Sequence, residues 1–349
     1  MHKLDIGDII DHNPREILAA VPDALSLTLG AGVRAPHPFA DAVAAAPLRT
    51  AAIAAGLLNG TRLSGETEAA VLGRGIRTTQ FAGAVSAGFQ GAARRSFDEQ
   101  AAHLGAVARV EVQRLGVAES VGALDLAAPL ENVGDGLQFK VSSATLRDGE
   151  AVTLSSIGRI ITVSRQVIFN DELDLIRDRI AATGTGAARH EARLVAAALE
   201  ANPTLSDGGV VFGAAYGNVV ATAFGDAGLG EAMGALRTMV AADGSALDAQ
   251  AVSLIVAPAL EFTARQLVFL TGLPLAVLVL PGLAAGRYYV AASPSVARNI
   301  VVGRLDGQSH PLAVEGVKAP LSYDGAAVRV RIDTASAMIG RVGIVRGGA

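Results

Sequence analysis

The sequence predicts an α+β protein, and three observations support this prediction. Apolar and polar residues alternate between Leu137 and Thr162 around an Arg-Asp-Gly-Glu turn at 147–150, which is typical of a β-hairpin. Apolar residues then recur at helical spacing between Asn170 and Asn202. After residue 205, short apolar strands alternate with helical segments, which indicates an α/β layer.

The first 76 residues are rich in alanine and predict three or four short helices. Breaks are expected at Pro22, Gly30–Gly32, 36–38 and Pro47. Two expected helices are Pro14–Ala20, capped by Asn13, and Ser64–Gly73, behind a Ser-Gly-Glu-Thr-Glu capping pattern. From Arg77 onward, a longer helix is expected to lead into a strand.

The hairpin is long and mostly polar, so it has little core of its own and is marginal in isolation. We therefore expect it to lie on a neighbouring molecule. The residues expected to make these intersubunit contacts are Phe139, Lys140, Arg147, Asp148, Gly149 and Glu150.

The long helix that follows is expected to begin at Asn170, Asp171 and Glu172. Asn170 stands where a cap should be, and the two acids would face the positive end of the helix. Gly184 and Gly186 suggest a kink or a short break, and Asn202-Pro203 ends the run.

Beyond the helix, the pattern predicts a helix at 230–240, strands at 253–258, 275–280 and 287–294, and a helix at 259–270. Further strands are expected between Val314 and Ile344, with a turn at 323–325. The apolar stretch Leu267–Leu283 is interrupted by one glycine and two prolines, so we interpret it as a helix end, a turn and a buried strand rather than a bilayer span.

Composition narrows the function classes. The 349 residues suffice for two domains, and a mean hydropathy of +0.41 with 18% charged residues fits either apolar surface buried between subunits or simple alanine enrichment. The absence of cysteine excludes disulfides and thiolate chemistry. A net charge of −4 argues against a broad nucleic-acid-gripping face. The acidic N-terminus does not read as a secretory signal.

The sequence contains no strong motif for a metal, catalytic or nucleotide site. The six histidines are scattered, so a zinc site is not expected. The segment Ala84–Gly88 lacks the first glycine of a nucleophile turn and lies in a helical context. The glycines between Gly225 and Gly234 resemble a dinucleotide loop with one residue too many, so a nucleotide-binding α/β enzyme remains one alternative.

Several short motifs together resemble one family. They are Thr78-Thr79-Gln80-Phe81, Asn170-Asp171-Glu172-Leu173, Leu199–Asn202 with Ser206-Asp207-Gly208, Pro258-x-Leu260-Glu261, and Tyr288-Tyr289. This series resembles the HK97-like major capsid proteins of tailed phages, most closely the Mu-like head subunits, some of which are fused to a ClpP-like prohead protease. The resemblance covers about 77–335, is absent from the first 76 residues, and keeps only Gly340 and Arg341 of the usual C-terminal signature.

The resemblance implies an HK97-like fold with an N-terminal arm, an extended loop, a P-domain with a spine helix, and an A-domain. The implied segments are an N-terminal helical extension or assembly arm at 1–76, arm and first P-domain part at 77–133, extended loop at 134–166, spine helix at 167–204, A-domain at 205–310, and P-domain return at 311–349.

The function implied is a major capsid protein that self-assembles into pentamers and hexamers of an icosahedral shell around double-stranded DNA. It would have no catalytic, cofactor or metal site and no membrane partner. Its partners would be its own copies and possible scaffold, protease, portal and decoration proteins. It would be located in the virion capsid, after assembly in the bacterial cytoplasm. An encapsulin-like nanocompartment shell is the alternative with the same fold.

Overall fold

The computed structural model describes residues 4, 6–59, 67–115, 119–121, 149–240, 246–317 and 324–348. The chain forms two compact units, each built from segments that are distant in the sequence. Unit 1 contains Met1–Gln100, Ser156–Ala188 and Ser309–Ile332, and unit 2 contains Ala101–Ser155, Arg189–Gln308 and Asp333–Ala349. Helix α8 and strand β11 each continue from one unit into the other.

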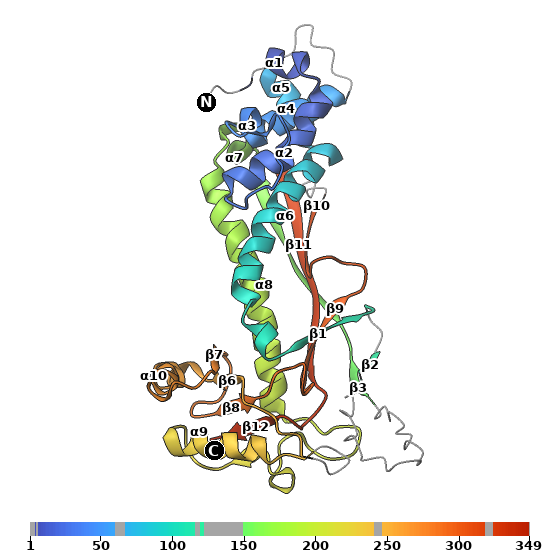
Figure 1. Cartoon of the computed structure of the whole chain (residues 1–349). Helices are drawn as coiled ribbons and strands as arrows, with labels where there is room; N and C mark the ends of the chain where they lie inside the picture. Colours follow the sequence, from blue (N-terminus) through green and yellow to red (C-terminus); the bar gives the residue numbers. More distant parts are fainter. Residues whose placement is uncertain are drawn as a thin grey trace, which may run out of the picture. The chain divides into compact units, whose positions relative to one another are not determined.

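Unit 1 begins with five helices, grouped together in blue in Figure 1: α1 (Ile6–Asp11), α2 (Pro14–Thr28), α3 (Ala40–Val43), α4 (Pro47–Leu58) and α5 (Glu68–Gly75). The Asn13 side chain accepts a hydrogen bond from the Arg15 amide at 3.1 Å, and Pro14 takes the first helical position, as the sequence predicts. The predicted break at Pro22 is wrong, because Pro22 lies inside α2. Its neighbours Val21 and Ala24 are fully buried, and this packing holds the helix across the missing amide.

Three further helices belong wholly or partly to unit 1: α6 (Thr79–Ala101), α7 (Arg165–Asn170) and α8 (Leu173–Ala201). The break suggested at Gly184 and Gly186 is wrong, because α8 is continuous through both. A Cβ at Gly184 would overlap the Ala93 carbonyl of α6. Glycine is therefore needed at this position for close helix packing rather than for a bend.

The strands of unit 1 are β4 (Ser155–Ser164, from residue 156), β10 (Leu312–Val317) and the first part of β11 (Gly325–Met338). β10 pairs antiparallel with β11, which fits the predicted turn at 323–325, although Tyr323 lies outside the described residues. β4 pairs with β11 as well. The strands predicted after Val314 are thus confirmed by β10 and β11.

Unit 2 holds η1 (Leu104–Ala106), β1 (Arg109–Gln113) and β9 (Ile300–Leu305), with β1 parallel to β9 and β9 antiparallel to the second part of β11. The helix-to-strand order predicted after Arg77 is therefore confirmed by α6 and β1. A small antiparallel pair joins β2 (Glu119–Val121) to β3 (Glu150–Val152). The first predicted hairpin strand, around Leu137, lies outside the described residues.

A second sheet of unit 2 has the strand order β5-β12-β8-β6-β7. Its strands are β5 (Val219–Val220), β12 (Ile344–Gly347), β8 (Tyr288–Ala291), β6 (Ser253–Val256) and β7 (Ala276–Val279), connected through η2 (Ala214–Tyr216), α9 (Asp226–Arg237), η3 (Pro258–Leu260) and α10 (Glu261–Thr271). This alternation confirms the predicted α/β layer. The stretch Leu267–Leu283 is the end of α10, a turn and β7, and no helix in the described parts of the chain is long and apolar enough to cross a membrane.

The two tyrosines of β8 face opposite sides of this sheet, as strand geometry requires of neighbouring residues. Tyr289 packs in a core with Val195 and Leu199 at the end of α8, whereas Tyr288 packs in a second core with Leu229 of α9. Both tyrosines are fully buried. The Tyr-Tyr pair therefore explains how one strand can hold helices on both faces of the sheet.

Candidate functional site

The start of the long helix differs from the prediction by three residues. Asn170 is the last residue of α7, Asp171 adopts a left-handed conformation with φ 56°, and α8 begins at Leu173. Asn170 therefore does not cap α8; its side-chain amide donates to the Glu172 carboxylate at 3.0 Å. The chain turns sharply between α7 and α8, so the cap and first-turn roles predicted for these residues are corrected.

Asp171 instead caps a different helix. Its carboxylate accepts hydrogen bonds from the amides of Leu48, at 2.9 Å, and Arg49, at 3.3 Å, in the first turn of α4. A negative charge at this position also complements the positive end of the α4 dipole. The acid predicted to serve the long helix thus binds the N-terminal helices to it.

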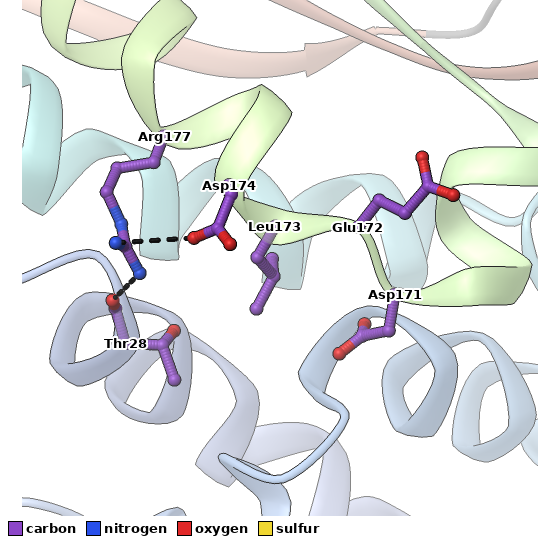
Figure 2. A pocket seen from close by; sticks show the side chains of 6 residues that line it. All are labelled: Thr28, Asp171, Glu172, Leu173, Asp174 and Arg177. Carbon is purple, nitrogen blue, oxygen red and sulfur yellow. Dashed lines mark hydrogen bonds and ion pairs between the residues drawn. The ribbon is translucent and has the colours of Figure 1, made fainter.

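A pocket of about 440 Å³ lies beside this turn, lined by Thr28, Asp171, Glu172, Leu173, Asp174 and Arg177. Figure 2 shows the Arg177 side chain extending between Asp174 and the end of α2. Its guanidinium lies 3.3 Å from the Asp174 carboxylate and donates to the Thr28 carbonyl at 2.7 Å. Thr28 is the last residue of α2, so a cation stands at the negative end of that helix.

The predicted hairpin residues are described only in part. Phe139, Lys140, Arg147 and Asp148 lie outside the described residues, whereas Gly149 and Glu150 stand at the start of β3. The Glu150 carboxylate accepts a hydrogen bond from the Ser206 amide at 2.6 Å. Glu150 therefore holds the start of β3 to the turn after α8, within its own subunit.

The same turn is bound to the C-terminal segment. Arg341 donates to the Asp207 carboxylate at 2.5 Å and to the Gly209 carbonyl at 3.1 Å, and its guanidinium carbon lies 4.1 Å from the centre of the Tyr216 ring. The Arg341 side chain is 11% exposed and the Asp207 side chain 43%, so only the guanidinium side of this ion pair is shielded from water. The Ser-Asp-Gly turn and the Gly340-Arg341 pair, noted separately in the sequence, thus form one contact.

A buried charged group lies on α8 in unit 2. The Glu191 side chain, 1% exposed, receives hydrogen bonds from Arg304 of β9 at 3.1 Å and from Thr334 of β11 at 3.2 Å. Burial raises the pKa of the Glu191 carboxyl, although Arg304 opposes that effect. Glu191 lies on α8 and its two partners lie on strands β9 and β11, so we interpret this group as a structural connection between helix and sheet.

A second polar group anchors the end of α8. The Glu200 carboxylate lies 2.8 Å from the Arg287 guanidinium and accepts a hydrogen bond from the Tyr289 hydroxyl at 3.2 Å. Burial beside this carboxylate raises the pKa of Tyr289 well above its usual range, so the hydroxyl stays protonated as a donor. The Tyr-Tyr motif therefore also locks the end of α8 onto β8.

The glycine-rich loop has a structural explanation. A Cβ at Gly228 would overlap the Ala223 carbonyl and would lie 2.7 Å from the Tyr288 hydroxyl, so glycine lets α9 approach the sheet closely. Asp226 places a carboxylate in the first turn of α9, where a pyrophosphate would need to bind. This arrangement disfavours the nucleotide-binding alternative.

The other chemical candidates gain no support. The Ser86 hydroxyl lies within α6 and donates to the Gly83 carbonyl at 2.9 Å, in the helical context that the sequence predicts. Among the residues that the structure describes, no group of three or more metal-binding side chains comes together.

Helix α10 presents an unusual surface. Phe262, Phe269 and Leu270 keep 78%, 85% and 70% of their surfaces exposed, whereas Ala264 and Leu267, on the opposite face, are buried in the core. Residues seven apart lie on the same side of a helix, so the two phenylalanines form one stripe. We call Phe262, Phe269 and Leu270 the α10 aromatic face. The helix was predicted from its periodicity, but this exposure was not.

The chain matches the family described as "Phage capsid protein" over residues 149–347, which is more than half of its length. The chain therefore belongs to the phage capsid protein family. It is a capsid shell protein, and its location is the virion capsid.

Three solved structures are similar to this chain. A virus-like particle from Pyrococcus furiosus has 14% identity and a TM-score of 0.48, over 73% of this chain and 95% of that one. A structure of Microbacterium phage Oxtober96 has 14% identity and a TM-score of 0.45, over 71% and 90%. The holo-SrpI encapsulin complex from Synechococcus elongatus has 14% identity and a TM-score of 0.44, over 70% and 86%. No curated protein matches the sequence significantly.

Proposed function

We propose that this chain is the major head subunit of a tailed phage or a related particle, and that it assembles into pentamers and hexamers of an icosahedral shell around double-stranded DNA. Its role is structural rather than enzymatic. Membership of the phage capsid family supports the proposal, together with the order of helix α6, strands β3 and β4, long helix α8 and α/β layer. The motifs at Leu173, Pro258, Tyr288 and Tyr289 favour the Mu-like branch.

The observation that carries the proposal is the α10 aromatic face. Large exposed apolar patches on soluble proteins mark interaction sites, and two phenylalanines at 78% and 85% exposure on one short helix form such a patch. The flanking charges, Glu261 and Arg265, pair with each other at 2.9 Å, so the face carries little net charge. A neutral, aromatic surface favours a protein partner over a nucleic acid, which needs cations for its phosphates.

The partner that fits this face is a neighbouring copy of the same chain. The two phenylalanine side chains alone offer roughly 330 Å² of apolar surface, at about 200 Å² for each ring with 78% and 85% of it exposed. A stable pairwise contact needs about 800 Å² on each partner, so the α10 aromatic face would supply part of a larger contact. A subunit with several neighbours in a closed shell combines several such partial contacts.

The remaining segments take the roles that the resemblance implies. Residues 134–166 would be the extended loop that lies on a neighbour, and within it Glu150 accepts a hydrogen bond from the Ser206 amide of its own subunit. Residues 77–133, 167–204 and 311–349 would form the arm and P-domain. Residues 205–310 would be the A-domain, which contains α10. The net charge of −4 suits a shell that encloses DNA without gripping it. Scaffold, protease, portal and decoration proteins would join during assembly in the bacterial cytoplasm.

Electron microscopy of particles from the native source, combined with nuclease-protection of their contents, tests this function. We expect closed shells with protected double-stranded DNA. Shells that hold protein cargo and no DNA would favour the encapsulin-like alternative, and a dispersed small oligomer that binds nucleotide would favour an enzyme using the Gly225–Gly234 loop.

A further inference from the structure

The five N-terminal helices α1 to α5 pack on one another within unit 1, where α2 contacts α6 and the beginning of α8, and α4 contacts α7. We call these five helices, Ile6–Gly75 as far as they are described, the N-terminal bundle. We propose that the N-terminal bundle is a permanent part of the folded subunit that fixes the start of α8, and that it is retained in the assembled particle. It lies outside the segment that defines the family, at 149–347.

The first support is electrostatic. Asp171 places a carboxylate at the N-terminus of α4, and Arg177 places a guanidinium at the C-terminus of α2. Each charge has the sign that complements the helix end it contacts. Both residues belong to the start of the long helix, one just before α8 and one in its second turn, so this region holds two helices of the bundle by opposite ends.

Helix α6 adds contacts of the same kind. Arg95 donates to the carbonyl of Gly30, just after α2, so a second cation serves the negative end of that helix. The Ser26 hydroxyl donates to the Gly88 carbonyl at 3.4 Å. A Cβ at Gly88 would lie 2.5 Å from the Cβ of Leu25, so α2 and α6 touch almost backbone to backbone.

The interior of the bundle is also closely packed. Nine of the twelve residues of α4 are buried, which places this helix at the centre rather than on a surface. A Cβ at Gly75 would overlap the Ala52 carbonyl, so α5 lies directly against α4. Arg49 of α4 pairs with Glu68 of α5, and α4 also contacts α7. The bundle is therefore a folded body with its own core and not a loose extension.

These contacts have a consequence for processing. If a segment is cleaved off during maturation, the rest of the subunit must be stable without it. Removing this bundle would take the Leu48 and Arg49 amides away from Asp171 and the Thr28 carbonyl away from Arg177. It would also uncover the glycine-lined side of α6 that fits Leu25. We therefore expect proteases to spare the peptide bonds of α2, α4 and α6 in the native chain.

Two measurements test the proposal. The first is peptide mapping of subunits from purified particles, which we expect to recover peptides of α1 to α5 as completely as those of α6 and α8. Subunits that begin after about residue 76 would overturn the inference, even if the particle itself confirms the shell function. The second uses the unassembled full-length chain, so its outcome does not depend on shell formation.

In the second measurement, limited proteolysis is followed by mass spectrometry for the parent and for Asp171→Ala, Arg177→Ala and Gly88→Val. Loss of a helix cap opens the structure locally, so we expect cleavage within α2 and α4 to accelerate about fivefold or more. Gly186→Ala is the matched control on α8, because its Cβ would enter open space, and it should cleave at the parent rate. Parent-like protection in all three test variants would contradict the proposal.

Discussion

Replacing Phe269 by serine tests whether the α10 aromatic face joins subunits. In the free subunit, 85% of the Phe269 surface is exposed, so the substitution removes little packing. We therefore expect the free energy of unfolding of the unassembled subunit to change by less than about 0.5 kcal/mol. Assembly should respond much more strongly, because a shell contact would cover the ring.

The size of the assembly effect follows from the exposed area. An aromatic side chain buries about 150–250 Å², so a ring that is 85% exposed has roughly 170 Å² still to lose to a partner. At about 25 cal/mol per Å² this corresponds to about 4 kcal/mol per contact, an upper value because binding also costs entropy. Since each 1.4 kcal/mol is a factor of ten, the association constant should fall by about 10- to 700-fold.

Sedimentation velocity over a concentration series, with electron microscopy of the same samples, measures this shift. Phe269→Leu is the control, since it keeps an apolar side chain at the same position and should retain most of the association. If Phe269→Ser assembles at the same concentration as the parent, with the same thermal stability, the α10 aromatic face is not a subunit contact and the argument from exposure fails.

Four further outcomes are expected. Glu191→Leu removes the 3.1 Å partner of the largely buried Arg304, so urea unfolding should show a loss of about 2–3 kcal/mol, and a change below about 0.5 kcal/mol would contradict the structural role. Burial lowers the pKa of His310, whose Nδ1 accepts a hydrogen bond from the Leu312 amide at 3.0 Å. The neutral imidazole therefore stabilises the fold above the unfolded pKa of 6.5, and this stabilisation is lost as the pH falls. His310→Gln should make the melting temperature less dependent on pH between about pH 7 and 5. Gly75→Ala should cost about 1–3 kcal/mol in thermal unfolding because its Cβ would overlap Ala52, whereas Gly83→Ala, with open space around it, should be nearly neutral. Particles boiled in denaturant should run as single subunits on gels, since the intersubunit contact predicted at Lys140 is non-covalent, and a ladder of multimers would show a covalent cross-link instead.

The sequence predicts elements well where a local pattern has one physical meaning. The apolar run from Tyr288 to Ala291 indicates a buried strand, and the segment 259–270 indicates a helix; both are confirmed as β8 and α10. Gly30 and Gly32, read as a break, have φ values of 79° and 69°, which glycine adopts without strain. These signals act within a few residues, so no tertiary knowledge is needed to interpret them.

The sequence predicts poorly where a residue serves a distant partner. Asp171 looks like a first-turn acid of its own helix, yet its carboxylate caps α4, 122 residues earlier in the chain. Gly184 looks like a helix break, yet it is the point where α8 meets Ala93 of α6. Pro22 looks like a helix end, yet burial of its neighbours keeps α2 continuous. In each case a tertiary contact overrides a sound local preference.

The candidate assembly surface shows the same limit. Apolar periodicity indicates a helix at 259–270 but does not indicate which apolar residues face the core and which face outward. Only the fold shows that Leu267 is buried while Phe269 is exposed. The hairpin contacts predicted at Phe139, Lys140, Arg147 and Asp148 lie outside the described residues, so they stay predictions, as does any contact of Gly149 with a neighbour.

The central claim, that this phage capsid protein forms a closed icosahedral shell, is tested most directly by cryo-electron microscopy of the purified full-length chain under assembly conditions. We predict closed particles with fivefold and sixfold clusters of subunits, with α10 of each subunit in contact with a neighbouring copy. A dispersed monomer or small oligomer over a wide range of concentration and salt, or particles in which Phe262 and Phe269 remain exposed to solvent, would contradict this account.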